Sequence, residues 1–184
     1  AGDEVPPITA VLKRLFGLAS ARHLVIGSAV AAMLGFGINY FFTSLMMRRF
    51  GLPIGDAGFY SGVIASLPAA LSVLGTGWLA DRLGARGPGA YALVPAVCLL
   101  IGGPLYAFAI TRDDLTVLLS LVSIATFLNF GYLGVTYAAL QNLMHPRMRA
   151  TTSALLNVVY GIASALGPFL LGVLSDGLAQ TRGE

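Results

Sequence analysis

The chain has 184 residues, of which 57% are hydrophobic and only 10% are charged, and its mean hydropathy is +0.82. Soluble domains carry about a quarter charged residues, so this composition excludes a water-soluble globular protein. The formal net charge of +3 comes from basic residues that are spread over several short segments and form no dense patch, which argues against a nucleic-acid-binding protein.

Residues 1–22 are predicted to form a cytoplasmic loop that contains a short amphipathic helix. Its apolar residues recur at the i, i+3, i+4, i+7 and i+8 positions of one helical face: Ile8, Val11, Leu12, Leu15 and Phe16. Lys13 and Arg14 occupy the other side. Such a helix either lies in the membrane interface or packs against a protein partner, and the pattern leaves both open.

Five stretches without Asp, Glu, Lys or Arg follow, and each exceeds 20 residues. A helix needs about 20 apolar residues to cross the hydrocarbon core of a bilayer. The sequence therefore predicts an all-α membrane protein whose transmembrane bundle covers residues 23–176. We expect five spans, at residues 24–47, 57–80, 91–111, 115–143 and 151–174, and an extracytoplasmic tail at 177–184.

The basic residues also predict an orientation. With a cytoplasmic N-terminus, seven Lys and Arg residues face inward and four face outward, and positive residues favour the cytoplasmic side. The Ala-, Gly- and Arg-rich composition indicates a bacterial inner membrane. Five spans would place the two termini on opposite sides of the membrane, so we expect the sequence to be a fragment of a larger bundle.

The sequence contains no pattern typical of an enzyme, a cofactor site or a metal site. HExxH, GxSxG and Cys/His ligand spacings are absent, and the single cysteine, Cys98, excludes an internal disulfide. The segment that begins Gly75-Thr76-Gly77 matches G-x-G-x-x-A. It closes a membrane span and does not join a strand to a helix, so we do not interpret it as a dinucleotide site.

Neutral polar residues recur at helical spacing inside three of the predicted spans, while the middle of each span contains no ionic residue. A charge at that depth usually marks a proton or ion path, so we expect any titrating group outside this segment. Neutral polar stripes must face protein or water, which leaves interhelical hydrogen bonds and a water-filled cavity as alternatives. We predict a substrate cavity lined by Asn39, Tyr40, Thr43, Asn129, Tyr132, Thr136, Asn157, Tyr160 and Ser164.

The sequence GWLADRLGAR at residues 77–86 resembles the G-x-L-A-D-R-x-G-R-K loop motif of the major facilitator superfamily, apart from Ala85. In that family the motif follows the second helix of each six-helix half, as it does here. Residues 136–141, 146–151 and 167–176 resemble the spinster-like branch. The resemblance extends from about residue 23 to residue 176 and aligns the five spans with helices 7–11 of the twelve-helix fold.

The resemblance implies alternating access between two six-helix bundles. The partners of this segment would then be the N-terminal half, the final helix, the lipid bilayer and a small amphiphilic, lipid-like solute, with proton coupling through the other half. It also implies a cytoplasmic latch formed by Gly77, Asp81, Arg82, Gly84, Arg86 and Arg149. The alternative is a membrane receptor or assembly module that has this fold and does not transport.

Overall fold

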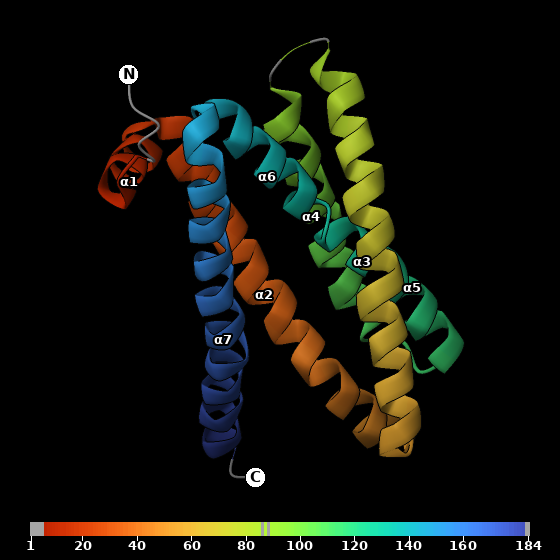
Figure 1. Ribbon diagram of the computed structural model, residues 1–184. Coiled ribbons are helices and arrows are strands. Elements are labelled where there is room, and N and C mark those ends of the chain that lie inside the picture. The colour runs from red at the N-terminus through yellow and green to blue at the C-terminus, as the bar shows by residue number, and fades with distance from the viewer. Residues whose placement is uncertain (1–5, 86, 88, 183–184) are drawn as a thin grey trace.

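Five long apolar helical segments cross the molecule in alternating directions. The structure is a computed structural model that describes residues 6–85, 87 and 89–182. Within those residues it contains helices and no strand: α1 (Ile8–Gly17), α2 (Ala19–Phe50), α3 (Ile54–Gly84), α4 (Ala90–Ala109), α5 (Leu115–Asn129), α6 (Tyr132–Leu143), a short 3-10 turn (Pro146–Met148) and α7 (Arg149–Arg182). The N-terminus and the α3–α4 connection lie at one end of the bundle, and the C-terminus lies at the other (Figure 1).

The helices confirm the predicted all-α class with five spans, and most of them are longer than the predicted spans. α2 continues to Phe50 and ends at Gly51, whose φ of 65° is the left-handed conformation that favours glycine after a helix. Arg48 and Arg49 lie in its last turn, where cations interact favourably with the helix dipole. Hydropathy locates the apolar part of a span, but the backbone ladder continues beyond it until a residue such as Gly51 ends it.

The fourth span differs most from its prediction because it consists of two helices. α5 ends at Asn129 and α6 begins at Tyr132, with Phe130 and Gly131 between them. No proline lies at this interruption, so the sequence pattern gave no warning of it.

The short helix α1 packs on the bundle with one face only. Val11 and Leu15 are buried, and Leu15 belongs to a core cluster with residues of α2, α6 and α7. Ile8 and Phe16 on the same helix remain exposed. Arg14 donates a hydrogen bond to the backbone oxygen of Leu143, 3.4 Å away, at the end of α6. α1 thus contacts its own chain and keeps an apolar edge exposed beside the end of α6.

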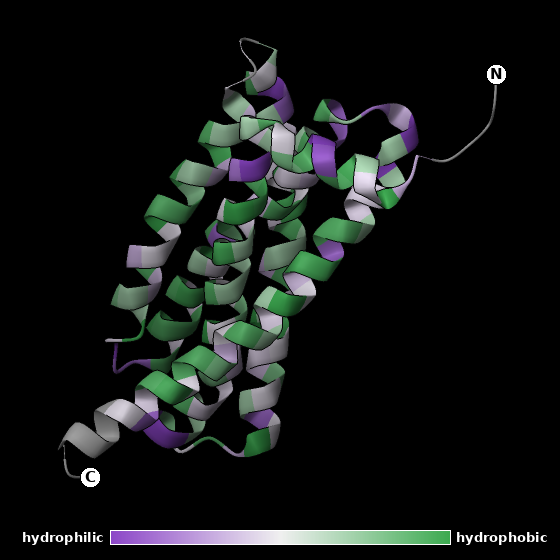
Figure 2. Cartoon of the chain, turned by 90° about the vertical axis from the view of Figure 1, so that its left-hand side faces the viewer, coloured by the Kyte–Doolittle hydropathy of each residue, from purple (hydrophilic) through white to green (hydrophobic). Residues whose placement is uncertain are grey.

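The bundle places apolar side chains on its outside and several hydroxyl groups in its interior. Hydrophilic residues gather mainly at the two ends, and a largely hydrophobic band lies between them (Figure 2). Leu74 and Leu100 are 73% and 75% exposed on the outer surface, which suits contact with lipid tails. The buried polar side chains are Ser28, Ser72, Thr76, Thr126, Thr136 and Thr152.

Arg49 fastens the outer end of α2 to the connection between α4 and α5. Its guanidinium donates to the backbone oxygen of Ile110, to that of Thr111 at 3.3 Å, and to the Asp113 carboxylate at 2.7 Å. The next residue, Asp114, caps α5 by accepting a hydrogen bond of 2.9 Å from the Val117 amide. These bonds fix the ends of three helices at the side of the bundle away from α1.

Two glycines allow α2 and α7 to meet with their backbones in contact. A Cβ at Gly167 would collide with the Met33 carbonyl oxygen and would lie 3.1 Å from the Gly37 amide nitrogen. A Cβ at Gly37 would lie 2.8 Å from the Leu171 side chain and 3.1 Å from the Gly167 carbonyl carbon. Small residues at helix crossings allow close approach in membranes, and this seam joins the first and last spans.

Substituting Gly167 tests this seam. We expect Gly167→Ala to destabilise the protein by about 1–3 kcal/mol, as overpacking of a close contact does, although Ala is the better helix former by about 1 kcal/mol. Thermal unfolding in detergent measures the change. Gly161→Ala is the matched control. Gly161 lies on the same helix, and a Cβ there would meet nothing within 4 Å. Equal stability of the two variants would contradict the close contact.

Candidate functional site

The interruption of the fourth span changes its hydrogen-bond ladder over four residues. The Phe130 amide still bonds the Thr126 oxygen at 3.0 Å, but the Gly131 amide bonds the Leu128 oxygen three residues back, at 3.2 Å. The Leu133 amide likewise bonds the Phe130 oxygen three residues back, at 3.1 Å. Tight i→i+3 turns of this kind often mark a hinge or a functional site within a helix.

Two hydroxyl groups of α3 bond the carbonyl oxygens at this interruption. Ser72 Oγ donates to the Phe127 oxygen, and Thr76 Oγ1 lies 3.0 Å from the Gly131 oxygen and 2.6 Å from the Ser72 oxygen. Both side chains are almost fully buried. Broken helices are tolerated at membrane depth where neighbouring Ser and Thr side chains satisfy the freed backbone groups, and α3 fulfils that requirement here.

The interruption points Asn129 and Tyr132 toward different neighbours. A Cβ at Gly102 of α4 would lie 3.1 Å from Asn129 Oδ1, so the amide packs directly against α4. Tyr132, in contrast, packs against Tyr160 of α7, with ring centroids 6.2 Å apart and ring planes at 80°. Both were predicted to line one face, a prediction that assumed a continuous helix through Phe130 and Gly131.

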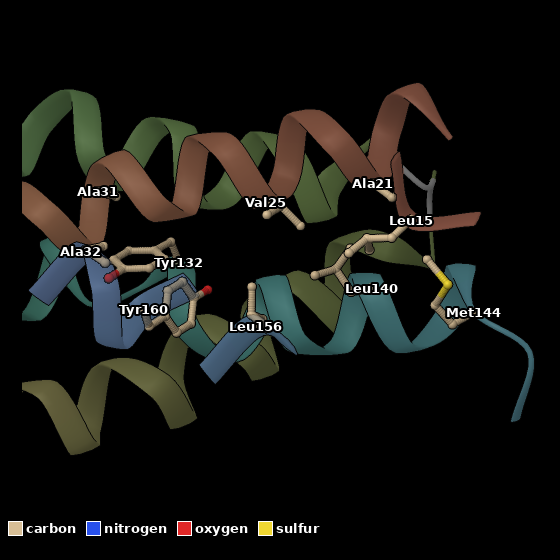
Figure 3. Close-up of a cluster of buried hydrophobic side chains, with 11 residues drawn as sticks. Leu15, Ala21, Val25, Ala31, Ala32, Tyr132, Leu140, Met144, Leu156 and Tyr160 are labelled. Atoms are coloured by element: carbon tan, nitrogen blue, oxygen red, sulfur yellow. The ribbon is translucent and has the colours of Figure 1, made fainter. Parts of the chain in front are cut away.

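Three tyrosines lie together where α6 meets α7. Tyr137 also packs edge-to-face on Tyr160, at 6.0 Å and 74°. Figure 3 shows Tyr132 and Tyr160 beside Ala32 of α2 in the same buried cluster. Thr136, between the two α6 tyrosines in sequence, is also buried, and its hydroxyl and that of Ser28 lie near the Tyr160 hydroxyl. The structure therefore brings three of the predicted cavity residues together: Tyr132, Thr136 and Tyr160.

Beside this cluster, two polar contacts connect α6 to α7. The Tyr137 hydroxyl donates to Asn157 Oδ1 at 2.5 Å, and Gln141 Nε2 donates to Ser153 Oγ at 3.3 Å. We call these four residues the α6–α7 ladder. Of these four only Asn157 was in the predicted set, although each helix carries its pair of ladder residues four positions apart, a spacing that puts them on one face.

The predicted residues of α2 lie apart from the tyrosine cluster. Asn39 donates to the Gly35 oxygen of its own helix at 2.9 Å, and Thr43 donates to Ser61 of α3 at 2.8 Å. They follow Ala32 by 7 and 11 residues, or about 10 and 16 Å at the rise of an α-helix. Tyr40 is 70% exposed. On α7, Ser164 donates to the Gly161 oxygen of its own helix at 2.8 Å.

Two of the predicted latch residues, Asp81 and Gly84, contact Tyr91 of α4. The Tyr91 hydroxyl donates to the Asp81 carboxylate at 2.8 Å, and a Cβ at Gly84 would lie 2.8 Å from the Tyr91 ring. The absence of a side chain at Gly84 therefore allows Tyr91 to reach Asp81. The sequence motif contains Asp81 and Gly84 but not Tyr91, which joins them only in the fold.

The basic residues of the predicted latch also bind locally. The Arg82 guanidinium lies 5.2 Å from the Trp78 ring centroid, and Arg149 Nε donates to the Gln141 oxygen at 3.0 Å, at the end of α6. Gly77 is half-buried on α3, and Arg86 lies outside the described residues. In this structure Asp81 binds Tyr91 while Arg149 binds the end of α6.

Within the described part of the chain, no three His, Cys, Asp or Glu side chains are grouped so that they could hold a metal ion. The polar side chains that join α6 to α7 contribute phenol, hydroxyl and amide groups.

Five helical segments long and apolar enough to cross a bilayer, one of them interrupted beside buried hydroxyls, define a multi-pass membrane protein. The chain belongs to the Major Facilitator Superfamily, whose family model matches residues 2–168. This match confirms the resemblance inferred from residues 77–86.

Individual relatives agree with the family. An MFS-type efflux pump of Mycolicibacterium smegmatis is 32% identical over 162 residues, which is 87% of this chain and 37% of the pump. A bacterial homologue of the human lysosomal transporter Spinster, inward-facing and unoccupied, matches 100% of this chain and 40% of its own, with a TM-score of 0.85 and 26% identity. Its inward-facing, occupied form matches 87% of this chain and 36% of its own, with a TM-score of 0.77 and 30% identity. The chain thus spans about two fifths of the length of these proteins and is close to the spinster-like branch.

The Tyr137–Asn157 contact of the ladder can be tested by a double-mutant cycle. We expect Tyr137→Phe and Asn157→Ala to be coupled by about 0.6 kcal/mol, and by no more than about 1.7, as hydrogen bonds between membrane helices are. The stability of all four forms toward denaturant in mixed micelles gives the coupling. Tyr132→Phe with Asn157→Ala is the control pair and should be additive. Additivity of the first pair would show that the bond does not form.

Proposed function

We propose that this chain is the C-terminal transport half of a secondary transporter that works by alternating access and moves an amphiphilic solute. The observation that carries the proposal is the α6–α7 ladder. Asn157 lies within a long apolar span and is nevertheless exposed on the surface of this bundle. Lipid cannot satisfy amide groups at membrane depth, so this surface faces water or a second bundle across a lumen.

The chemistry of the site supports a solute with a neutral polar part and a large apolar part. Tyrosine rings provide apolar area together with a polar edge, and the ladder provides donors and acceptors. The relatives, an efflux pump and a bacterial homologue of a lysosomal transporter, support solute movement across a membrane and, by analogy with the pump, export. Lysophospholipids and lipophilic drugs combine these properties.

The neutrality of the spans bears on how transport is driven. The middle of each span contains no Asp, Glu, Lys or Arg, so this half has no side chain at midplane whose charge changes during a proton-coupled cycle. We propose that a coupling carboxylate lies in the N-terminal half. Orientation follows from the basic residues: the α1 end of the bundle faces the cytoplasm of a bacterial cell, and the protein lies in the inner membrane.

We propose that the α3–α4 loop acts as the cytoplasmic latch. Asp81 accepts one hydrogen bond, from Tyr91, and remains exposed, so its carboxylate has acceptor capacity left for a second partner. Arg149 lies at the same end of the bundle as Asp81. In the proposed cycle, Asp81 and Arg149 approach each other when the cytoplasmic side closes.

A receptor with the same fold is the competing proposal, since a receptor binds a solute without accumulating it. Proteoliposomes that contain the complete transporter, with a fluorescent lysophospholipid and with ethidium as probes, separate the two. Accumulation against a gradient supports transport. Saturable binding without accumulation supports the receptor.

Cysteine accessibility tests the lumen. In a Cys98→Ser background, we expect Asn157→Cys to react with a water-soluble maleimide severalfold faster than Ile162→Cys. At 100° per residue the two positions lie about 140° apart around α7, and Ile162 is exposed and apolar. Mass spectrometry of the labelled protein measures both rates.

Asn129→Cys and Tyr40→Cys in the same background extend the map to α5 and α2. Each is expected to react when one side of the transporter is open, with solute protecting it. Shielding of Asn157→Cys and Asn129→Cys in every conformation would remove the lumen and the transport proposal with it.

Replacing Asp81 tests the latch. An exposed ion pair contributes about 0–1 kcal/mol, which amounts to less than about fivefold in rate. Breaking a latch that stabilises one end state should lower the transport rate by more than this. We expect Asp81→Asn to lower transport by roughly tenfold while the protein folds normally. Asp56→Asn is the control, since Asp56 is an exposed carboxylate at the opposite end of the same helix. Equal transport rates for both variants would show that the α3–α4 loop is an ordinary solvated loop and does not act as a latch.

A further inference from the structure

Ser72 and Thr76 lie one turn apart on α3, and both side chains bond the interrupted part of the fourth span. We propose that these two hydroxyls are positioning residues for solute binding: they hold the interruption in the geometry that directs Asn129 toward α4 and Tyr132 toward α7. This inference rests on the proposed function.

The ladder of the fourth span explains why a side-chain donor is needed. In a continuous helix the Gly131 amide would bond the Phe127 oxygen four residues back. Here it bonds Leu128, and Ser72 Oγ takes its place as the donor to Phe127. A buried carbonyl that loses its donor retains the full penalty of desolvation, so removing the hydroxyl favours a rearrangement of the interruption.

Burial prevents water from replacing these hydroxyls. Ser72 is 0% exposed and Thr76 is 3% exposed. Three glycines bring the helices together on both sides of the bonds. A Cβ at Gly131 would lie 2.8 Å from Thr76 Cγ2, one at Gly134 would lie 3.1 Å from Val73 Cγ1, and one at Gly75 would lie 3.5 Å from the Phe127 ring.

The same burial keeps Ser72 and Thr76 from touching a solute directly. Their effect must pass through the residues on either side of the interruption, Asn129 and Tyr132. A rotation at Phe130 and Gly131 changes the angle between α5 and α6, and therefore the distance between the amide packed on Gly102 and the ring packed on Tyr160. The two hydroxyls consequently control affinity for solute.

Transport kinetics test this role in the complete protein reconstituted in proteoliposomes. For the fluorescent lysophospholipid we expect Ser72→Ala and Thr76→Val each to raise KM by about threefold, the equivalent of one interhelical hydrogen bond, with maximal velocity little changed. Ser72→Thr and Thr76→Ser retain a hydroxyl and should restore KM. Ser66→Ala is the matched control, because Ser66 lies on the same helix and donates to Gly62 of that helix at 2.7 Å.

Hydrogen exchange provides a measurement that does not depend on transport. Backbone amides of residues 127–135 should exchange faster in Ser72→Ala and Thr76→Val than in Ser66→Ala, while exchange in α2 and α7 stays unchanged. Faster exchange together with the rise in KM supports the positioning role. Unchanged exchange, or faster exchange with an unchanged KM, would overturn it.

The two measurements also separate this inference from the proposed function. If the unmodified protein accumulates no amphiphile, the proposed function fails, and the role in solute binding falls with it. If the unmodified protein transports and the hydroxyl variants match Ser66→Ala in KM, only the positioning role fails. If KM also rises in Ser72→Thr and Thr76→Ser, which keep the hydroxyl, the rise reflects a folding defect and the positioning role fails.

Discussion

In a lipid environment the backbone has to satisfy its own hydrogen bonds, and this constraint determines where a membrane helix can be interrupted. A freed carbonyl that faced hydrocarbon would cost several kcal/mol. The fourth span is interrupted at Phe130 and Gly131, where buried hydroxyls of α3 supply donors to the Phe127 and Gly131 carbonyls. α6 begins directly after this arrangement and carries Tyr132 and Tyr137, whose rings pack on Tyr160 of α7.

Hydroxyl groups and amide groups serve different purposes in this bundle. The buried hydroxyls of Ser72 and Thr76 bond backbone oxygens and fix helix geometry. The amides of Asn157 and Gln141 lie at the surface of the bundle and bond other side chains, which a solute or water can replace at little cost. Close contact at Gly37 and Gly167 joins α2 to α7. A half-bundle built in this way suits movement as a rigid unit with a polar surface that can exchange partners.

The features that depend on local composition could be predicted from the sequence. The features that depend on contacts between helices could not. Long uncharged runs predicted the five spans, and residues 77–86 predicted the family. The interruption was not predicted, because residues 129–132 contain no proline and single glycines such as Gly131 also occur inside uninterrupted spans. A continuous helical wheel therefore placed Asn129 and Tyr132 on one face.

Tyr137 was missed for the same reason, since its place beside Asn157 depends on how α6 turns after the interruption. Tyr91, the partner of Asp81, comes from a different helix and lies outside the motif.

The glycine-rich segment at the end of α3 shows why a sequence pattern must be judged by its structural setting. Gly75, Thr76 and Gly77 match the start of a dinucleotide fingerprint, in which glycines let a backbone approach a pyrophosphate. On α3 the same small residues let a neighbouring helix approach: Gly75 lies against the Phe127 ring, and Thr76 reaches the Gly131 carbonyl. In both settings the missing side chain of glycine lets another group come close to the backbone. A polar atom of the segment then forms a hydrogen bond with that group. The group that approaches Thr76 is here the neutral backbone carbonyl of Gly131 on a neighbouring helix, so on α3 the pattern marks a contact between helices.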